Sequence, residues 1–146
     1  MNDWQKRFAQ KLETVQSVAR DRFEQKADET LTPTFKEFGE FVRQYVVQAT
    51  TPLTDFGIRT FRFAMSEDAY LLMTFRHMGF EQCEVQVEYF LPGGNSVPTK
   101  REAVTFGEAS TSWCRGVFER ALDQFLDTLL NTMGSPDVIM AGACAD

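Results

Sequence analysis

The side chains best suited to covalent chemistry in this sequence are a histidine and a cysteine that lie close together in the chain. His77 is the only histidine among the 146 residues, and Cys83 follows it after a short interval. A cysteine becomes a nucleophile when an imidazole can take its proton, so a hairpin joining the two segments would create a Cys–His pair. The competing interpretation is a small core cysteine and a polar group at a strand end, which the alternating apolar residues around Cys83 favour.

Metal and phosphate chemistry have weaker support in the sequence. Cys83, Cys114, Cys144 and the single histidine lack the paired short spacings of a zinc site. The segment 92–95 lacks the Gly-Lys-Ser/Thr continuation of a phosphate-binding loop and is typical of a hairpin connection. We therefore expect a non-enzymatic protein that uses neither a metal nor another cofactor.

The charge balance argues against two classes of partner. The chain carries 15 basic and 21 acidic residues, a formal net charge of −6 at pH 7, without a basic block. A surface that follows phosphates needs clustered bases, so we expect neither nucleic acid nor an anionic membrane as a partner. The sequence also lacks the apolar run of a signal peptide or a membrane span. Its cysteines do not fit a disulfide framework. These features predict a reduced, cytoplasmic protein and leave open secretion by a route without a cleaved signal.

The spacing of apolar residues predicts the elements that must position these side chains. Apolar residues recur at helical spacing up to about residue 47, alternate over 61–106, and return to helical spacing over 113–133. We expect a single α+β domain over 1–146, with N-terminal helices, a four-stranded antiparallel β-meander and a C-terminal helix packed on one face of the sheet in two layers. The expected segments are helices at 3–29, 33–48 and 110–133, the meander at 57–106, and a tail at 137–146.

Local signals predict where the helices begin and end. Thr32 is suited to cap the second helix, with Pro33 in its first turn. Ser110 or Thr111 is suited to cap the last helix, which Gly134 and the residues after it should stop. The apolar residues 138–140 could add an edge strand in the tail.

Strand parity assigns the meander two faces of different character. The inner face is apolar and predicts a core covered by the helices at 33–48 and 110–133; it comprises Phe61, Phe63, Leu71, Met73, Phe75, Cys83, Val85, Val87, Tyr89, Leu91, Val104 and Phe106. The outer face mixes arginine, carboxylate and aromatic side chains. Its opposite charges can support the strand register, and its composition is also typical of a partner surface. The residues of this possible partner-facing surface are Arg62, Tyr70, Leu72, Arg76, Glu84, Glu88, Phe90 and Arg101.

The first helix carries a narrow apolar stripe on an otherwise charged surface. Its members, Trp4, Phe8, Leu12, Val15, Ala19, Phe23 and Ala27, lie three or four residues apart. The simpler interpretation is a surface helix lying on its own domain. The alternative is a protruding helix that pairs with a second copy. Either the same chain or a second chain could also place this helix on the outer face of the sheet.

The helix at 33–48, the meander over 57–91 and the helix at 110–133 together resemble the type III secretion chaperone-like group. The resemblance lies in architecture and composition and implies a small, acidic, dimeric α+β protein that binds other proteins. We therefore expect a non-enzymatic, cytosolic, chaperone-like protein that forms a homodimer and has a possible protein partner. The alternative is a regulatory domain that binds a small ligand in an aromatic-lined pocket between sheet and helices.

Overall fold

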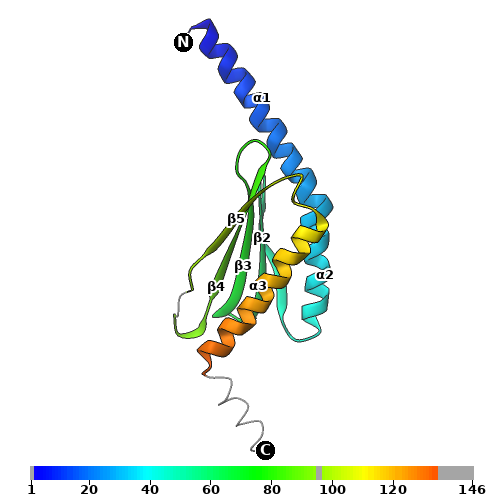
Figure 1. Cartoon of the computed structure of the whole chain (residues 1–146), viewed down its shortest axis with the longest axis vertical. Helices are drawn as coiled ribbons and strands as arrows, with labels where there is room; N and C mark the ends of the chain where they lie inside the picture. Colours follow the sequence, from blue (N-terminus) through cyan, green and yellow to red (C-terminus); the bar gives the residue numbers. More distant parts are fainter. Residues whose placement is uncertain (1, 95–96, 135–146) are drawn as a thin grey trace, which may run out of the picture.

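One long helical rod forms the N-terminal part of the chain in the computed structural model, which describes residues 2–94 and 97–134 (Figure 1). Helix α1 spans Asp3–Lys26, a π-helical turn spans Ala27–Leu31, and α2 spans Thr32–Arg43. The rod begins with a capping box in which the Asn2 side chain accepts from the Gln5 N–H at 2.8 Å, and Gln5 Oε1 accepts from the Asn2 N–H at 3.0 Å. The predicted tail at 137–146, with its possible edge strand at 138–140, lies outside the described residues.

The predicted break between the first two helices is wrong, because a π-helical turn carries the rod through it. Thr32 has helical backbone angles instead of the extended conformation of a capping residue. Its N–H donates to the Ala27 carbonyl. Pro33 has no N–H, and its ring crowds the preceding turn of an α-helix. A wider π turn placed before the proline relieves this crowding and lets the helix continue.

Helix α2 ends at Arg43, earlier than the predicted end at residue 48. The Val47 N–H donates to the Val42 carbonyl, and the Val46 N–H donates to the Arg43 carbonyl, both at 3.3 Å. These are the two bonds of a Schellman motif, in which glycine usually holds the position that Val46 occupies here with φ 63°. Because no glycine marks this stop, the apolar pattern alone extends the predicted helix too far.

The sheet is an antiparallel meander in the order β1-β2-β3-β4-β5. Its last four strands match the predicted segment 57–106, whereas the prediction of only four strands is wrong. The observed strands are β1 Gln48–Asp55, β2 Ile58–Ser66, β3 Ala69–His77, β4 Gln82–Phe90 and β5 Lys100–Thr105.

Strand β1 escapes prediction because it is an edge strand with a proline in it. Its register against β2 shifts between Thr50 and Leu53, at Pro52. Proline cannot donate to a ladder and is tolerated at sheet edges and bulges. Ala49 is the one buried residue of the strand, so no alternation of apolar side chains reveals it.

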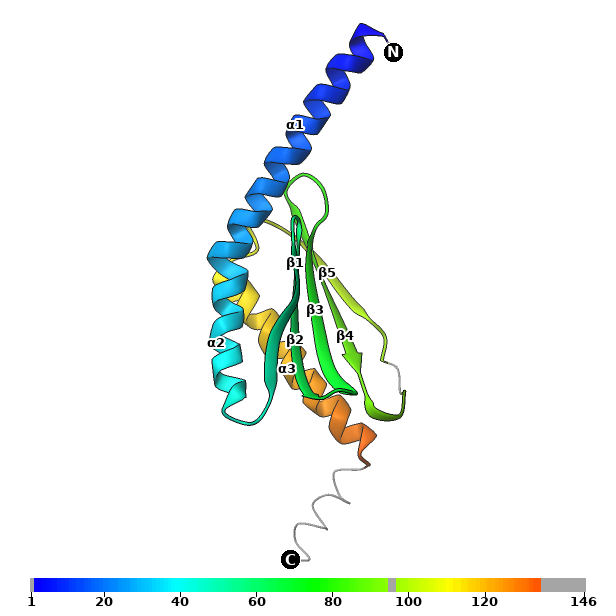
Figure 2. The same cartoon turned by 180° about the vertical axis from the view of Figure 1, so that it is seen from behind.

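Helix α3, Thr111–Thr132, crosses the same sheet face as the rod and completes the two-layer α+β arrangement that was predicted (Figure 1). Ser110 Oγ accepts from the Trp113 N–H at 3.1 Å, so Ser110 is the cap of this helix. The three α-helices of the described residues all lie on one side of the sheet, and none of them covers the other side (Figure 2).

The core is built from aromatic side chains on the inner face of the sheet, as strand parity predicts. Phe61, Phe63 and Phe75 are at most 1% exposed. Phe118 of α3 lies with its ring centroid 5.6, 6.0 and 5.9 Å from theirs. Phe35 of α2 stacks on Phe61 at 4.7 Å. These rings fill the space where sheet, α2 and α3 meet and hold the three elements together.

Candidate functional site

Residues 3–18 of α1 project beyond the sheet, and we call them the arm (Figure 1). Every residue from Asn2 to Gln16 is exposed, and the first buried side chain is that of Ala19. The arm nevertheless carries apolar side chains at intervals of three and four residues, which places them on one helix face. This arm stripe consists of Trp4, Phe8, Leu12, Val15 and Val18, each at least 42% exposed. Contiguous exposed apolar surfaces are typical of interaction sites, so the arm stripe is a candidate for one.

The edge of the arm stripe is basic. Lys11 lies three residues after Phe8 and four before Val15, so it borders the stripe, and Arg7 lies one turn earlier on the same side. The acidic Glu13 lies on the opposite side of the helix. A partner for the stripe should therefore be apolar with acidic groups beside it.

An ion pair joins the rod to the sheet at the base of the arm. The Glu24 carboxylate accepts from Arg59 Nη2 at 2.8 Å, from Arg59 Nη1 at 3.1 Å, and from the Gly57 N–H at 3.0 Å. Arg59 is only 6% exposed. Burial alone would lower the pKa of Arg59, but hydrogen bonding and Coulombic attraction from Glu24 and Asp28 outweigh it and raise that pKa above its usual value. The rod is thereby fixed to the β1–β2 hairpin just below the arm.

An apolar groove of about 290 Å³, which we call the α2–α3 groove, lies at the other end of the rod. Val42 and Val47, which the Schellman motif holds together, form part of one wall. Both charged residues that line it, Glu119 and Asp123, are acidic. Its apolar lining consists of Phe38, Phe41, Val42, Val47, Met65, Leu122, Phe125 and Leu126.

The groove was not among the site residues expected from the sequence, where the helix at 33–48 was expected to cover the inner face of the sheet. The alternative of an aromatic-lined pocket between sheet and helices comes nearest to it, since Phe38, Phe41 and Phe125 line the groove. In the structure Phe41 and Tyr45 remain mostly exposed, with ring centroids 5.4 Å apart. One signal for the groove was available in the sequence. The aromatic face of the helix at 33–48 is wider than one helix can bury against a sheet that α3 also covers.

The strand register places the eight residues predicted as a partner surface together on the outer face. None of the described helices covers this face (Figure 2). The Arg62 guanidinium lies 4.3 Å from the centroid of the Tyr70 ring. Tyr70 in turn stacks on Phe90 with centroids 4.5 Å apart. The three side chains form a ladder across β2, β3 and β4, and stacking of this kind adds to the strand pairing.

Two interpretations of the outer face, ion pairs between its opposite charges and cover by the first helix of the same chain, are not borne out in the described residues. Arg76 lies directly opposite Glu84, but within the described part of the chain none of the ion pairs involves the predicted arginines and carboxylates of this face. Gln86 donates to Glu88 at 2.9 Å instead. Nor does α1 of this chain cover the outer face, because its buried part joins the core through Phe23 on the inner face.

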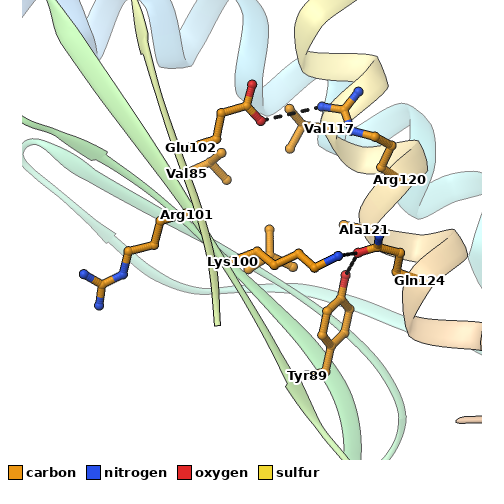
Figure 3. Close-up of a pocket in the computed structure, with 10 residues that line it drawn as sticks. Val85, Tyr89, Lys100, Arg101, Glu102, Val117, Arg120, Ala121 and Gln124 are labelled. Carbon is orange, nitrogen blue, oxygen red and sulfur yellow. Dashed lines mark hydrogen bonds and ion pairs between the residues drawn. The ribbon is translucent and has the colours of Figure 1, made fainter. Parts of the chain in front are cut away.

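A second groove, of about 460 Å³, lies between α3 and the edge of the sheet formed by β4 and β5 (Figure 3). Gln124 Oε1 accepts from the Tyr89 hydroxyl at 3.1 Å and from Lys100 Nζ. Arg120 and Glu102 form an ion pair at 3.7 Å. Burial raises the pKa of Tyr89, which keeps its hydroxyl protonated as a donor.

The floor of this groove is aliphatic, with Val85 and Val87 beneath the polar groups. Tyr89 is its one aromatic lining residue. Arg101 points away from the groove, toward the outer face (Figure 3). The groove therefore combines an apolar base with convergent polar groups, which is the composition of many small-molecule sites.

His77 and Cys83 are brought together, as the hairpin hypothesis requires, and lie directly opposite each other on β3 and β4. Cys83 is 4% exposed. Burial raises the pKa of its thiol to about 12, so the thiol stays protonated near neutral pH. A His77 ring nitrogen lies 3.3 Å from the Phe80 carbonyl oxygen. The geometry favours a core cysteine over a thiolate nucleophile.

Across residues 2–94 and 97–134, no cluster of three or more His, Cys, Asp and Glu side chains is arranged to hold a metal ion. In the same residues, no helix combines the length and apolarity needed to cross a membrane.

Comparison with known proteins assigns the chain to no family. It matches no protein-family model, and no curated protein or solved structure is significantly similar to it. Function must therefore be inferred from the surfaces of the molecule itself.

Proposed function

We propose that this protein is a non-enzymatic, protein-binding domain of the cytoplasm, with a chaperone-like role, and that it forms a homodimer through the arm. The observation that carries the proposal is the arm stripe. Trp4 and Phe8 are 60% and 52% exposed, and they stack with ring centroids 5.3 Å apart.

The energetics of the arm support this function. Burying one large apolar side chain contributes about 1.5–3 kcal/mol, and tryptophan is among the residues that dominate binding energy at interfaces. A stripe that begins with Trp4 and Phe8 therefore represents a substantial binding energy that the single chain does not use.

Light scattering coupled to gel filtration tests the dimer. We expect twice the chain mass of 16.7 kDa at tens of micromolar, and a shift to the monomer mass for Trp4→Glu, because a buried unpaired carboxylate opposes association. Gln10→Glu places the same charge on the far side of the arm and should leave the dimer intact. A wild-type protein that stays monomeric at these concentrations contradicts the proposal.

A regulatory domain that binds a small ligand is the second candidate, and the groove in Figure 3 favours it. Lys100 offers a cation above an aliphatic floor, beside the Arg120–Glu102 ion pair, which suits a small carboxylate with an apolar body. A panel of such carboxylates should raise the melting temperature of the wild type and leave that of Lys100→Ala unchanged. Equal responses of the two proteins would contradict this candidate.

A further inference from the structure

We propose that the arm of one copy docks into the α2–α3 groove of a second copy. The arm of the second copy docks in the same way into the groove of the first. This inference deepens the proposed homodimer and rests on it. It names the surface that receives the arm, and it turns two unused apolar surfaces of the chain into the two sides of one interface.

The two surfaces match in chemistry. The arm stripe is a single row of large apolar side chains headed by Trp4 and Phe8. The α2–α3 groove is an apolar trough between two helices, with Phe41 and Leu126 exposed at 57% and 48%. An amphipathic helix laid into an apolar groove is a common mode of protein recognition.

The two surfaces also match in charge. Arg7 and Lys11 border the arm stripe, whereas Glu119 and Asp123 are the charged residues that line the groove. Docking therefore places bases beside acids at the rim of an apolar contact. Complementary rim charges of this kind fix the register of a complex and speed its formation.

The positions of the two surfaces allow both contacts to form at once. The arm is one end of the α1–α2 rod, and α2, at the other end, forms one wall of the groove (Figure 1). A twofold axis across the rod places each arm beside the groove of the other copy, so the interface closes and uses the same patches on both chains. At 1.5 Å per residue the arm is roughly 24 Å long and α2 roughly 18 Å long, so the arm can cover the groove.

Two other occupants fit less well. Pairing one arm with another would bring the bases Arg7 and Lys11 of both copies into one short contact, where like charges oppose association. The chain segment 135–146 contains Asp137 and Asp146 and no base, so its charge has the same sign as that of Glu119 and Asp123.

A charge exchange tests the docking. We expect Lys11→Glu and Asp123→Lys each to raise the dimer dissociation constant about tenfold, and the double variant Lys11→Glu/Asp123→Lys to return it to within about threefold of the wild type. Sedimentation equilibrium measures the constant. Circular dichroism and urea unfolding confirm that each variant is folded.

Lys6→Glu is the matched control on the arm, since Lys6 lies away from the arm stripe, and it should change the constant less than about twofold. If Asp123→Lys has no effect while Lys11→Glu weakens the dimer, the arm binds another surface and the groove docking is overturned. Failure of the double variant to recover also overturns it. A wild-type protein that is monomeric overturns the proposed homodimer itself, so the two failures are distinguishable.

Discussion

The two parts of helix α1 have the same backbone geometry and opposite surroundings. The arm, residues 3–18, is almost entirely exposed, whereas Ala19 and Phe23 are at most 2% exposed and Phe23 packs beside His77 of the sheet. Apolar residues recur at the same helical spacing in both parts. The spacing of apolar residues therefore shows that a helix has an apolar face. Only the neighbouring elements determine which part of that face is buried.

The packed part of α1 allows the unsupported arm to be helical. Starting a helix is costly, whereas adding residues to an existing helix is cheap. The packed part of α1 and the Glu24–Arg59 pair supply the existing helix. The capping box at Asn2 and Gln5 satisfies backbone donors at the free end. The arm thus extends from a fixed base and presents its stripe in a defined direction.

The largest expected effect is on the free energy of unfolding, which should respond differently when a phenylalanine is removed from each part of α1. Phe23→Ala should lower the free energy of unfolding by about 3–5 kcal/mol, because it leaves a cavity in the core. Phe8→Ala should change it by less than about 1 kcal/mol when measured by urea unfolding at submicromolar protein, where a weakened dimer contributes little. An equal loss for both variants would mean that the arm packs on its own domain.

Removing the charge at the base of the arm should have the next largest effect. Glu24→Gln should lower the free energy of unfolding by about 2–3 kcal/mol, since it leaves the buried Arg59 without its principal partner. Glu13→Gln, on the exposed arm, is the matched control and should be neutral within about 0.5 kcal/mol. Chemical denaturation measures both. A neutral Glu24→Gln would show that packing alone fixes the rod.

Thiol chemistry provides a smaller test of the same contrast. Cys114 is fully buried and interacts with Thr34 and Lys26 of the rod, and burial raises the pKa of its thiol to about 11. In a Cys144→Ser background we expect Cys83 and Cys114 to resist an aromatic disulfide reagent at pH 8. A cysteine placed at Ala9 on the arm should react at once. Rapid reaction of the two native thiols would show that the core beneath the packed part of α1 opens readily.

The same thiols predict a pH dependence of stability. Their pKa values in the folded protein, about 12 for Cys83 and about 11 for Cys114, lie above the ordinary value of 9.0. Above pH 9 the unfolded chain therefore releases these protons first. The stabilisation is fully present below pH 9 and decreases as the pH rises toward the folded values, by roughly 1 kcal/mol per thiol at pH 10. Replacing both cysteines by alanine should remove this part of the decrease.

The smallest expected effect concerns the far end of the rod. Val46 holds a left-handed backbone conformation in which its branched side chain is strained. Val46→Gly should raise the free energy of unfolding by about 1 kcal/mol, while Tyr45→Gly, at a neighbouring residue of ordinary conformation, should lower it. Thermal unfolding of the two variants checks the difference in sign. A destabilised Val46→Gly would indicate that the exposed Val46 side chain makes contacts that outweigh the strain.

The sequence predicts elements well where their signals are local. The alternation of Cys83, Val85 and Val87 predicts a buried strand face, and Ser110 or Thr111 predicts the start of the last helix. The structure confirms both and shows that Ser110 is the cap. Prediction fails where the deciding residue is atypical. Pro52 conceals an edge strand, and Val46 stands where a glycine would mark the end of a helix.

The candidate site was only partly accessible from sequence. The outer-face residues do lie together, because strand parity is a geometric consequence of the backbone. Their expected arginine–carboxylate pairs are not formed, because side chains that face solvent gain little from pairing. The α2–α3 groove could not be foreseen, since it depends on how far α3 lies from α2 and on which aromatic rings that spacing leaves uncovered.

By itself the sequence determined the helical character of both ends of the chain, the four strands β2 to β5, the two faces of the sheet and the existence of an apolar stripe on the first helix. These follow from the period of the residues along the chain, which depends on neighbours within a few positions. Only the tertiary structure decided that the stripe is divided into a packed part and a free arm. That division depends on contacts between residues far apart in the chain, such as Glu24 with Arg59. The spacing of residues along the sequence does not reveal such contacts.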